Sequence, residues 1–108
     1  MLRSTVFSTT MAFAIDFASL ELNIKVCFGE ELSEDMKDSI EIVLDDALTG
    51  LAKTPEARRT VFALKEQDGE IAKAAIQVRL REMVTDCIAD AVNRLEYSLA
   101  KLSVSVQS

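Results

Sequence analysis

Acidic side chains crowd one stretch of the sequence, residues 30–52, which holds eight aspartates or glutamates and a single lysine. Carboxylates this close together attract cations, either a metal ion or the basic side chains of another protein. A calcium loop presents its oxygens from an irregular backbone with a glycine turn, whereas these acids recur three and four residues apart, as on a helix. The pattern therefore favours a protein partner over a metal site.

An isoleucine lies within the acidic face. At about 100° per residue, Ile42 falls roughly 20° from Glu31, inside the arc of the acids, while Met36 and Ile40 fall on the opposite side. Because interface centres tend to be apolar and their rims polar, we predict that this face binds a basic partner. The predicted partner-binding residues are Glu31, Glu34, Asp35, Asp38, Glu41, Ile42, Asp45 and Asp46.

A solvated helix face is the alternative interpretation of the same residues. Like charges three or four residues apart cost about 0.2–0.5 kcal/mol per pair, and basic side chains elsewhere would offset part of that cost. Residues 53–82 carry seven bases and five acids. In this interpretation the acids keep the protein in solution and are partly neutralised within the fold by Arg58, Arg59, Arg79 and Arg81.

Catalytic and cofactor chemistry finds little support in the residue types. The chain has no histidine, which is the usual general base and the commonest metal ligand. Its two cysteines, Cys27 and Cys87, form no CxxC pair, and its three glycines are isolated, so no phosphate-binding loop is present. We therefore expect no enzymatic activity, no cofactor and no metal site.

The composition is that of one globular domain, residues 1–108, with 49% hydrophobic and 28% charged residues. A net charge of −6 disfavours binding to nucleic acid or to an anionic membrane surface. No run of apolar residues is long enough to predict a membrane-spanning helix. Two cysteines without a disulfide pattern, both expected in the core, favour a cytoplasmic location.

Alternation of apolar residues predicts an antiparallel β-hairpin over about residues 5–28. Odd positions such as Phe7 and Phe13 are apolar in its first half, and even positions from Leu20 to Phe28 are apolar in its second half. A turn near residues 16–19 accounts for the switch. A helix is the alternative here, because apolar residues between 13 and 24 also recur at spacings of three and four.

Three helices are predicted after the hairpin. Ser33 is suited to cap a helix over about residues 33–49, and Thr54 with Pro55 begins a second helix over about 55–65. Apolar residues then recur at helical spacing over about 70–102. The predicted fold class is α+β, with an N-terminal antiparallel β-hairpin packed against two to three helices, the last long.

The length of the last helix suggests self-association. A helix over residues 70–102 would be about 50 Å long, whereas a compact domain of this size has a radius of gyration of about 13 Å. We therefore expect a homo-oligomer formed through residues 76–102. The alternative is an extra strand at about 74–82, where apolar and polar residues alternate, and the alternating tail LSVSVQS predicts a short edge strand.

Residues 20–66 resemble the ribbon-helix-helix family of DNA-binding dimers in the order of strand, helix, turn at Gly50 and second helix. The resemblance implies that Glu21, Asn23 and Lys25 face the bases and that phosphates meet the helix start at Thr54. The acidic first helix and the net charge oppose binding to a phosphate backbone.

These observations favour a non-enzymatic protein-protein interaction module whose acidic helix binds a basic protein, including a nucleic-acid-binding one. An inhibitor, or an antagonist that mimics nucleic acid as some phage proteins do, fits this composition. The alternatives are a homo-oligomeric structural or assembly subunit and a ribbon-helix-helix-like DNA-binding dimer.

Overall fold

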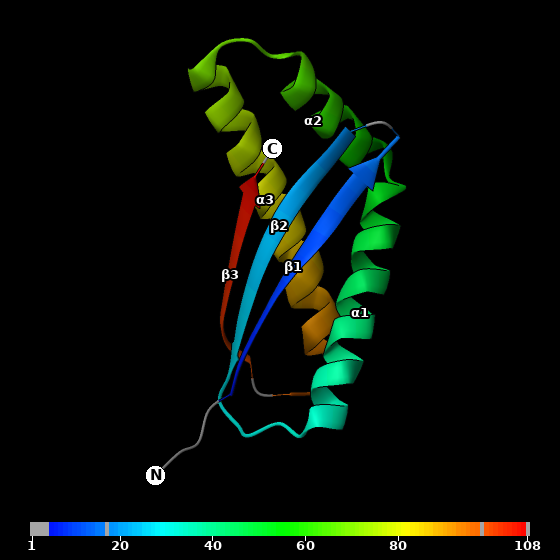
Figure 1. Ribbon diagram of the computed structural model, residues 1–108, viewed down its shortest axis with the longest axis vertical. Coiled ribbons are helices and arrows are strands. Elements are labelled where there is room, and N and C mark those ends of the chain that lie inside the picture. Colours follow the sequence, from blue (N-terminus) through cyan, green and yellow to red (C-terminus); the bar gives the residue numbers. More distant parts are fainter. Residues whose placement is uncertain (1–4, 17, 98, 108) are drawn as a thin grey trace.

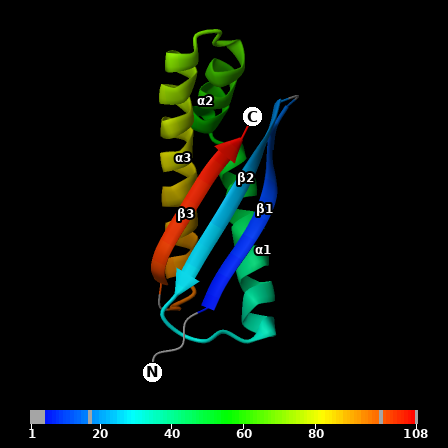
Figure 2. The same ribbon diagram turned by 60° about the vertical axis from the view of Figure 1, so that its left-hand side comes forward.

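The computed structural model describes residues 5–16, 18–97 and 99–107. Its elements are β1 (Thr5–Ile15), β2 (Ala18–Phe28), α1 (Glu34–Ala52), α2 (Pro55–Glu66), α3 (Glu70–Asn93) and β3 (Leu99–Gln107). The strands form one antiparallel sheet in the order β1-β2-β3, and the helices cover one of its faces (Figures 1 and 2). The predicted α+β fold with an N-terminal hairpin and a long last helix is confirmed.

A tight turn explains why the apolar parity switches between the first two strands. Phe13 pairs with Leu20 across the hairpin, so odd residues of β1 and even residues of β2 share one face. Asp16 follows β1 with a φ of 53°, a left-handed conformation that aspartate adopts more readily than most side chains. The hairpin is therefore as predicted, and the helical alternative for this segment is wrong.

Side-chain caps set the starts of the first two helices. The Met36 backbone N–H donates to the Ser33 hydroxyl at 3.2 Å, and the Ala57 N–H donates to Thr54 at 3.3 Å, as the cap pattern predicts. Helix α1 continues three residues beyond the predicted end at 49. It does so because Gly50 keeps a helical backbone and the following Leu51 packs against the core.

The prediction of a helix over residues 70–102 is wrong in its last part. Helix α3 ends at Asn93, and Glu96 takes a left-handed φ of 61°, which a helix cannot continue through. Residues from Leu99 onward form β3, which pairs with β2 and buries Val104. The leucines of this segment fit the spacing of a helix as well as the alternation of a strand. Pairing with β2 favours the strand.

The alternative strand at 74–82 is also wrong, because these residues lie inside α3. Leu80 is fully buried and Ile76 packs against the core, whereas Val78 lies on the outer side of the helix with 42% of its surface exposed. A helix places Ile76 and Leu80 on one side and Val78 on another, whereas a strand would place all three on one side.

The core lies between the sheet and the pair of helices α1 and α3. Its fully buried apolar side chains include Leu22, Val26, Phe28, Ile40, Leu44, Val61, Leu80, Val84, Ile88 and Val92. Burial of each large apolar side chain contributes about 1.5–3 kcal/mol. The strands and both long helices run along the same axis, so the molecule measures 49 × 25 × 18 Å (Figure 2).

Candidate functional site

The acidic residues lie on the exposed surface of α1 and on the loop before it. Ile42 is among them with 69% of its surface exposed, while Ile40 and Leu44 are fully buried on the opposite side of the helix. Placement of Ile42 away from the core is therefore as predicted. The role of this surface in binding stays a prediction.

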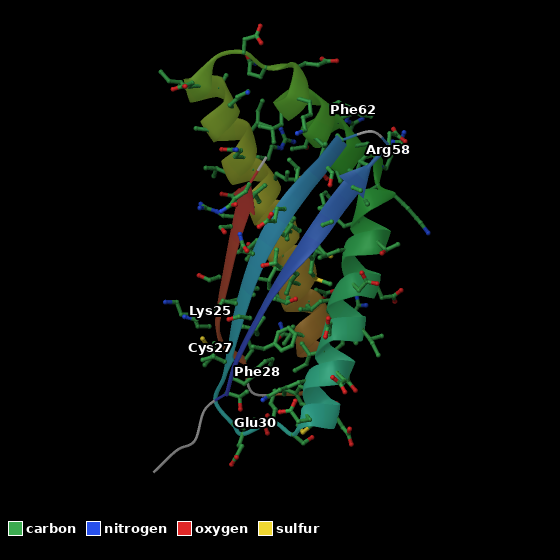
Figure 3. All side chains as sticks on the ribbon, in the orientation of Figure 1. Lys25, Cys27, Phe28, Glu30, Arg58 and Phe62 are labelled. Atoms are coloured by element: carbon green, nitrogen blue, oxygen red, sulfur yellow. The ribbon has the colours of Figure 1, made fainter. Side chains whose placement is uncertain are left out.

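Two of the arginines expected to neutralise α1 are engaged elsewhere. Arg58 Nη2 lies 2.9 Å from Asp16 Oδ2 at the hairpin turn, and Arg79 Nη2 lies 3.8 Å from Glu56 Oε1 on α2. Figure 3 places Arg58 at the hairpin end of the molecule. These two arginines therefore do not neutralise the carboxylates of α1.

Most acids of α1 have no cationic neighbour in the described ranges. The ammonium group of Lys37 lies 3.2 Å from Glu34, but that pair is local to the first turn. Five other acids of this helix have no such neighbour in the described chain: Asp35, Asp38, Glu41, Asp45 and Asp46. Within residues 5–16, 18–97 and 99–107, no lysine or arginine nitrogen lies within 4.0 Å of their carboxylates.

A groove separates α1 from β1, and the sequence did not predict it. Its volume is about 360 Å³. Residues 11–15 of β1 line one wall, and the last two turns of α1, including Asp45 and Leu48, line the other, with Lys53 just after them. Asp16 and Arg58 close it at the hairpin end. The groove joins the acidic helix to the outer edge of the sheet.

The edge of β1 lacks the features that protect edge strands in most proteins. Its eleven residues include no charged residue, proline or glycine, and its register with β2 has no bulge. Natural edge strands carry charges, proline or bulges that prevent pairing with another chain. By contrast, β3 carries Lys101, and its register with β2 shifts at Cys27. The uncharged run from Thr5 to Ile15 is the sequence signal for this edge.

No protein-family model matches this chain, and no curated protein or solved structure matches it either.

The residues implied by the ribbon-helix-helix resemblance lie on β2. Glu21, Asn23 and Lys25 do point away from the helices, on the open face of the sheet. However, β1 and β3 occupy both edges of β2. This strand therefore has no free edge for pairing with a second copy.

The expectation that both cysteines lie in the core is wrong for Cys27. It is half-buried on the open face of the sheet, because it shares the parity of Lys25. Cys87 is half-buried where α3 contacts α1, and its thiol donates to the Ala47 carbonyl at 3.4 Å. Burial raises the pKa of the Cys87 thiol, the Asp90 carboxylate raises it further, and Arg94 lowers it.

An exposed apolar strip on the first turns of α3 was also missed. Ile71 is 90% exposed and Val78 is 42% exposed, and the alanines at 74 and 75 lie exposed between them. By contrast, Leu80, Val84 and Ile88 are fully buried in the core of the chain itself. The expected oligomer surface at 76–102 is thus largely used within the protomer.

The described residues offer neither a metal-binding cluster nor a membrane-spanning helix. Among those described, no three acidic or cysteine side chains gather closely enough to hold a metal ion. None of the described helices combines the length and apolar character needed to cross a bilayer.

Proposed function

We propose that this protein is a non-enzymatic interaction protein that binds a basic protein through the outer surface of α1. The observation that carries the proposal is Ile42, a large apolar side chain with 69% of its surface in solvent. Among the described residues, the carboxylates nearest to it in the helix have no cationic partner, namely those of Asp35, Asp38, Glu41, Asp45 and Asp46. Solvation of the helix requires the carboxylates but not the isoleucine.

Each part of this surface contributes differently to binding. Burial of an isoleucine side chain against a partner contributes on the order of 1.5–3 kcal/mol. The carboxylate rim steers a basic partner toward the surface and accelerates association, and this effect falls with ionic strength. Asp38 and Asp45 lie on the rim within one turn of Ile42, where a lysine or arginine of the partner reaches them.

The partner that fits best is a nucleic-acid-binding protein in the same cytoplasmic compartment. Such proteins present basic surfaces shaped for a row of phosphates. The carboxylates of α1 offer a row of negative charge at intervals of roughly 4.5–6 Å along the helix. In this proposal the protein acts as an antagonist that occupies the basic surface, as some phage proteins do.

Affinity capture from a lysate of the natural host tests the proposal. The wild-type protein is compared with Ile42→Glu and with the double variant Asp38→Lys, Asp45→Lys. Asp86→Lys is the matched control, because it reverses an exposed carboxylate on α3. We expect the basic proteins captured by the wild type and the control to be absent from both α1 variants. Equal capture by all four proteins would contradict the proposal.

A structural or assembly subunit is the second candidate, favoured by the apolar strip at Ile71 and Val78 on α3. In this case a second copy covers the strip, and the acids of α1 serve solvation. Light scattering on the wild type and on Ile71→Glu distinguishes the candidates. An assembly of fixed size that dissociates in the variant favours this second function, whereas a monomer in both favours the binding protein.

A further inference from the structure

We propose that the basic partner binds by adding an extended strand to the free edge of β1, with its cationic side chains facing α1. This inference rests on the proposed function, because it names how the partner of the same acidic helix is recognised. Two observations support it: the edge of β1 has no protective features, and a groove lies between that edge and α1.

The edge of β1 offers main-chain recognition. As the outermost strand of the sheet, β1 presents a row of backbone N–H and C=O groups on the side away from β2. Addition of a strand satisfies these groups and requires only that the added segment be extended. No charge, proline or bulge within its eleven residues opposes this addition.

Helix α1 lies on the β1 side of the molecule and comes nearest to β1 toward the hairpin turn (Figure 1). At one end, the Leu32 backbone N–H donates to the Thr5 hydroxyl at 3.0 Å, just before α1 begins. At the other end, Asp45 and Leu48 face residues 11–15 across the groove. A strand added to β1 therefore has the loop before α1 near one end and the last two turns of α1 near the other.

The spacing of the carboxylates fits an added strand. Asp45 lines the groove, and Glu41 and Asp38 precede it on the same side of the helix. The rise along the helix axis is about 6 Å from Glu41 to Asp45 and about 4.5 Å from Asp38 to Glu41. Side chains on one face of a strand recur about every 6.8 Å. Lysines or arginines at every second position of the added strand can therefore each reach a carboxylate of α1.

A second copy of this chain fits the edge poorly. Two-fold pairing of β1 with its own copy would set the two α1 helices side by side on the same face of the joined sheet. Their acidic sides, including Asp38 and Asp45, would then approach each other, and like charges at close range oppose association. The carboxylates of α1 would instead attract the cationic side chains of a basic strand, so we assign the edge to a basic segment.

Synthetic peptides test this inference by NMR titration of the labelled protein at low salt. The probe is a nine-residue peptide that alternates lysine and threonine. One control has the same composition in two blocks, and the other keeps the alternating sequence but is N-methylated at every second residue, which blocks backbone pairing. We expect the probe to bind at least tenfold more tightly than either control. Its binding should shift resonances in β1 and in residues 38–45, and slow amide exchange along the β1 edge.

Three outcomes would overturn strand addition. Equal binding of all three peptides with shifts confined to α1 leaves the acidic surface as the site but removes the β1 edge from it. Failure of the probe to bind at low salt overturns the inference, and so does protection of the β1 edge by dimerisation in the absence of peptide. The proposed function fails separately if Asp45→Lys leaves the binding of every peptide unchanged.

A variant of the protein provides an independent check. Thr9→Lys places a cation on the side of β1 that faces the helices, where Thr9 is half-buried between two apolar residues. Ser105→Lys is the control on the exposed face of the opposite edge strand. We expect Thr9→Lys to weaken binding of the alternating peptide at least tenfold and Ser105→Lys to leave it unchanged. An equal effect of both variants would contradict strand addition.

Discussion

The Arg58 guanidinium donates a hydrogen bond to the Asp16 carboxylate at 2.9 Å and thereby joins α2 to the turn of the hairpin. The same bond holds the guanidinium away from the carboxylates of α1. Arg58 also lines the end of the groove between β1 and α1. The pair therefore leaves the charge of α1 available while it closes one end of the groove.

Replacement of Arg58 by glutamine should have a small effect on stability. Both side chains of the pair are almost half exposed, at 46% and 43%, and ion pairs of this kind contribute about 0.2–1 kcal/mol. We expect the free energy of unfolding in urea to fall by no more than about 1 kcal/mol. A loss several times larger would mean that α2 depends on this contact for its position.

Ile42 and Ile40 should respond in opposite ways to truncation. Ile40→Ala removes a fully buried side chain and should lower the free energy of unfolding by about 2–5 kcal/mol. Ile42→Ala changes an exposed position and should stay within about 0.5 kcal/mol of the wild type. Chemical denaturation of the two variants checks this contrast, and similar losses in both would place Ile42 in a packed environment.

Reversal of one charge on α1 should stabilise the free protein. Asp38 lies three or four residues from Glu34, Asp35 and Glu41, so Asp38→Lys replaces three like-charge pairs with opposite-charge pairs. We expect a gain on the order of 1 kcal/mol in urea unfolding at low salt. Because salt screens both kinds of pair, the gain should shrink in 0.5 M sodium chloride. A gain that does not change with salt would point to another cause.

The two cysteines should differ in reactivity toward a thiol reagent under native conditions. Cys27 lies on the open face of the sheet, whereas Cys87 lies between α3 and α1 with its thiol bonded to Ala47. We expect Cys27 to be modified first, with Cys87 reacting fully only after unfolding. Mass spectrometry of the partly modified protein identifies the site, and preferential modification of Cys87 would contradict the prediction.

The raised pKa of Cys87 should make stability depend on alkaline pH. Because the folded state holds the thiol proton more tightly than the unfolded state, this contribution is complete below the ordinary pKa of 9.0. It is lost as the pH rises through the raised value. Between pH 8 and 10.5, the wild type should therefore lose more stability than Cys87→Ala, as measured by thermal unfolding. Identical losses in the two proteins would contradict the prediction.

Local patterns were sufficient for the first two thirds of the fold. The parity switch between Phe13 and Leu20 predicts the hairpin, because a tight turn places both side chains on one face. Ser33 and Thr54 cap the helices at the predicted positions. Leu99 and Leu102 misled the prediction because they fit a helical stripe as well as a strand, and only pairing with β2 distinguishes the two.

The candidate site was partly predictable. A helical projection placed Ile42 among the acids because it needs no knowledge of the neighbouring elements. The groove beside β1 could not be predicted from the sequence, because it depends on which side of α1 faces the sheet. That orientation follows from Leu44 and Leu48, whose burial positions Asp45 at the groove.

The place of β3 in the sheet has a consequence for synthesis of the protein. Its partner β2 lies near the start of the sequence, and three helices intervene before residues 99–107 arrive. Until β3 has been synthesised, the nascent chain has a second open edge on β2, and Leu22 and Val26 lack the neighbouring strand on that side. Pairing of distant segments is slow, so the emerging polypeptide depends on β3 to complete the hydrophobic layer.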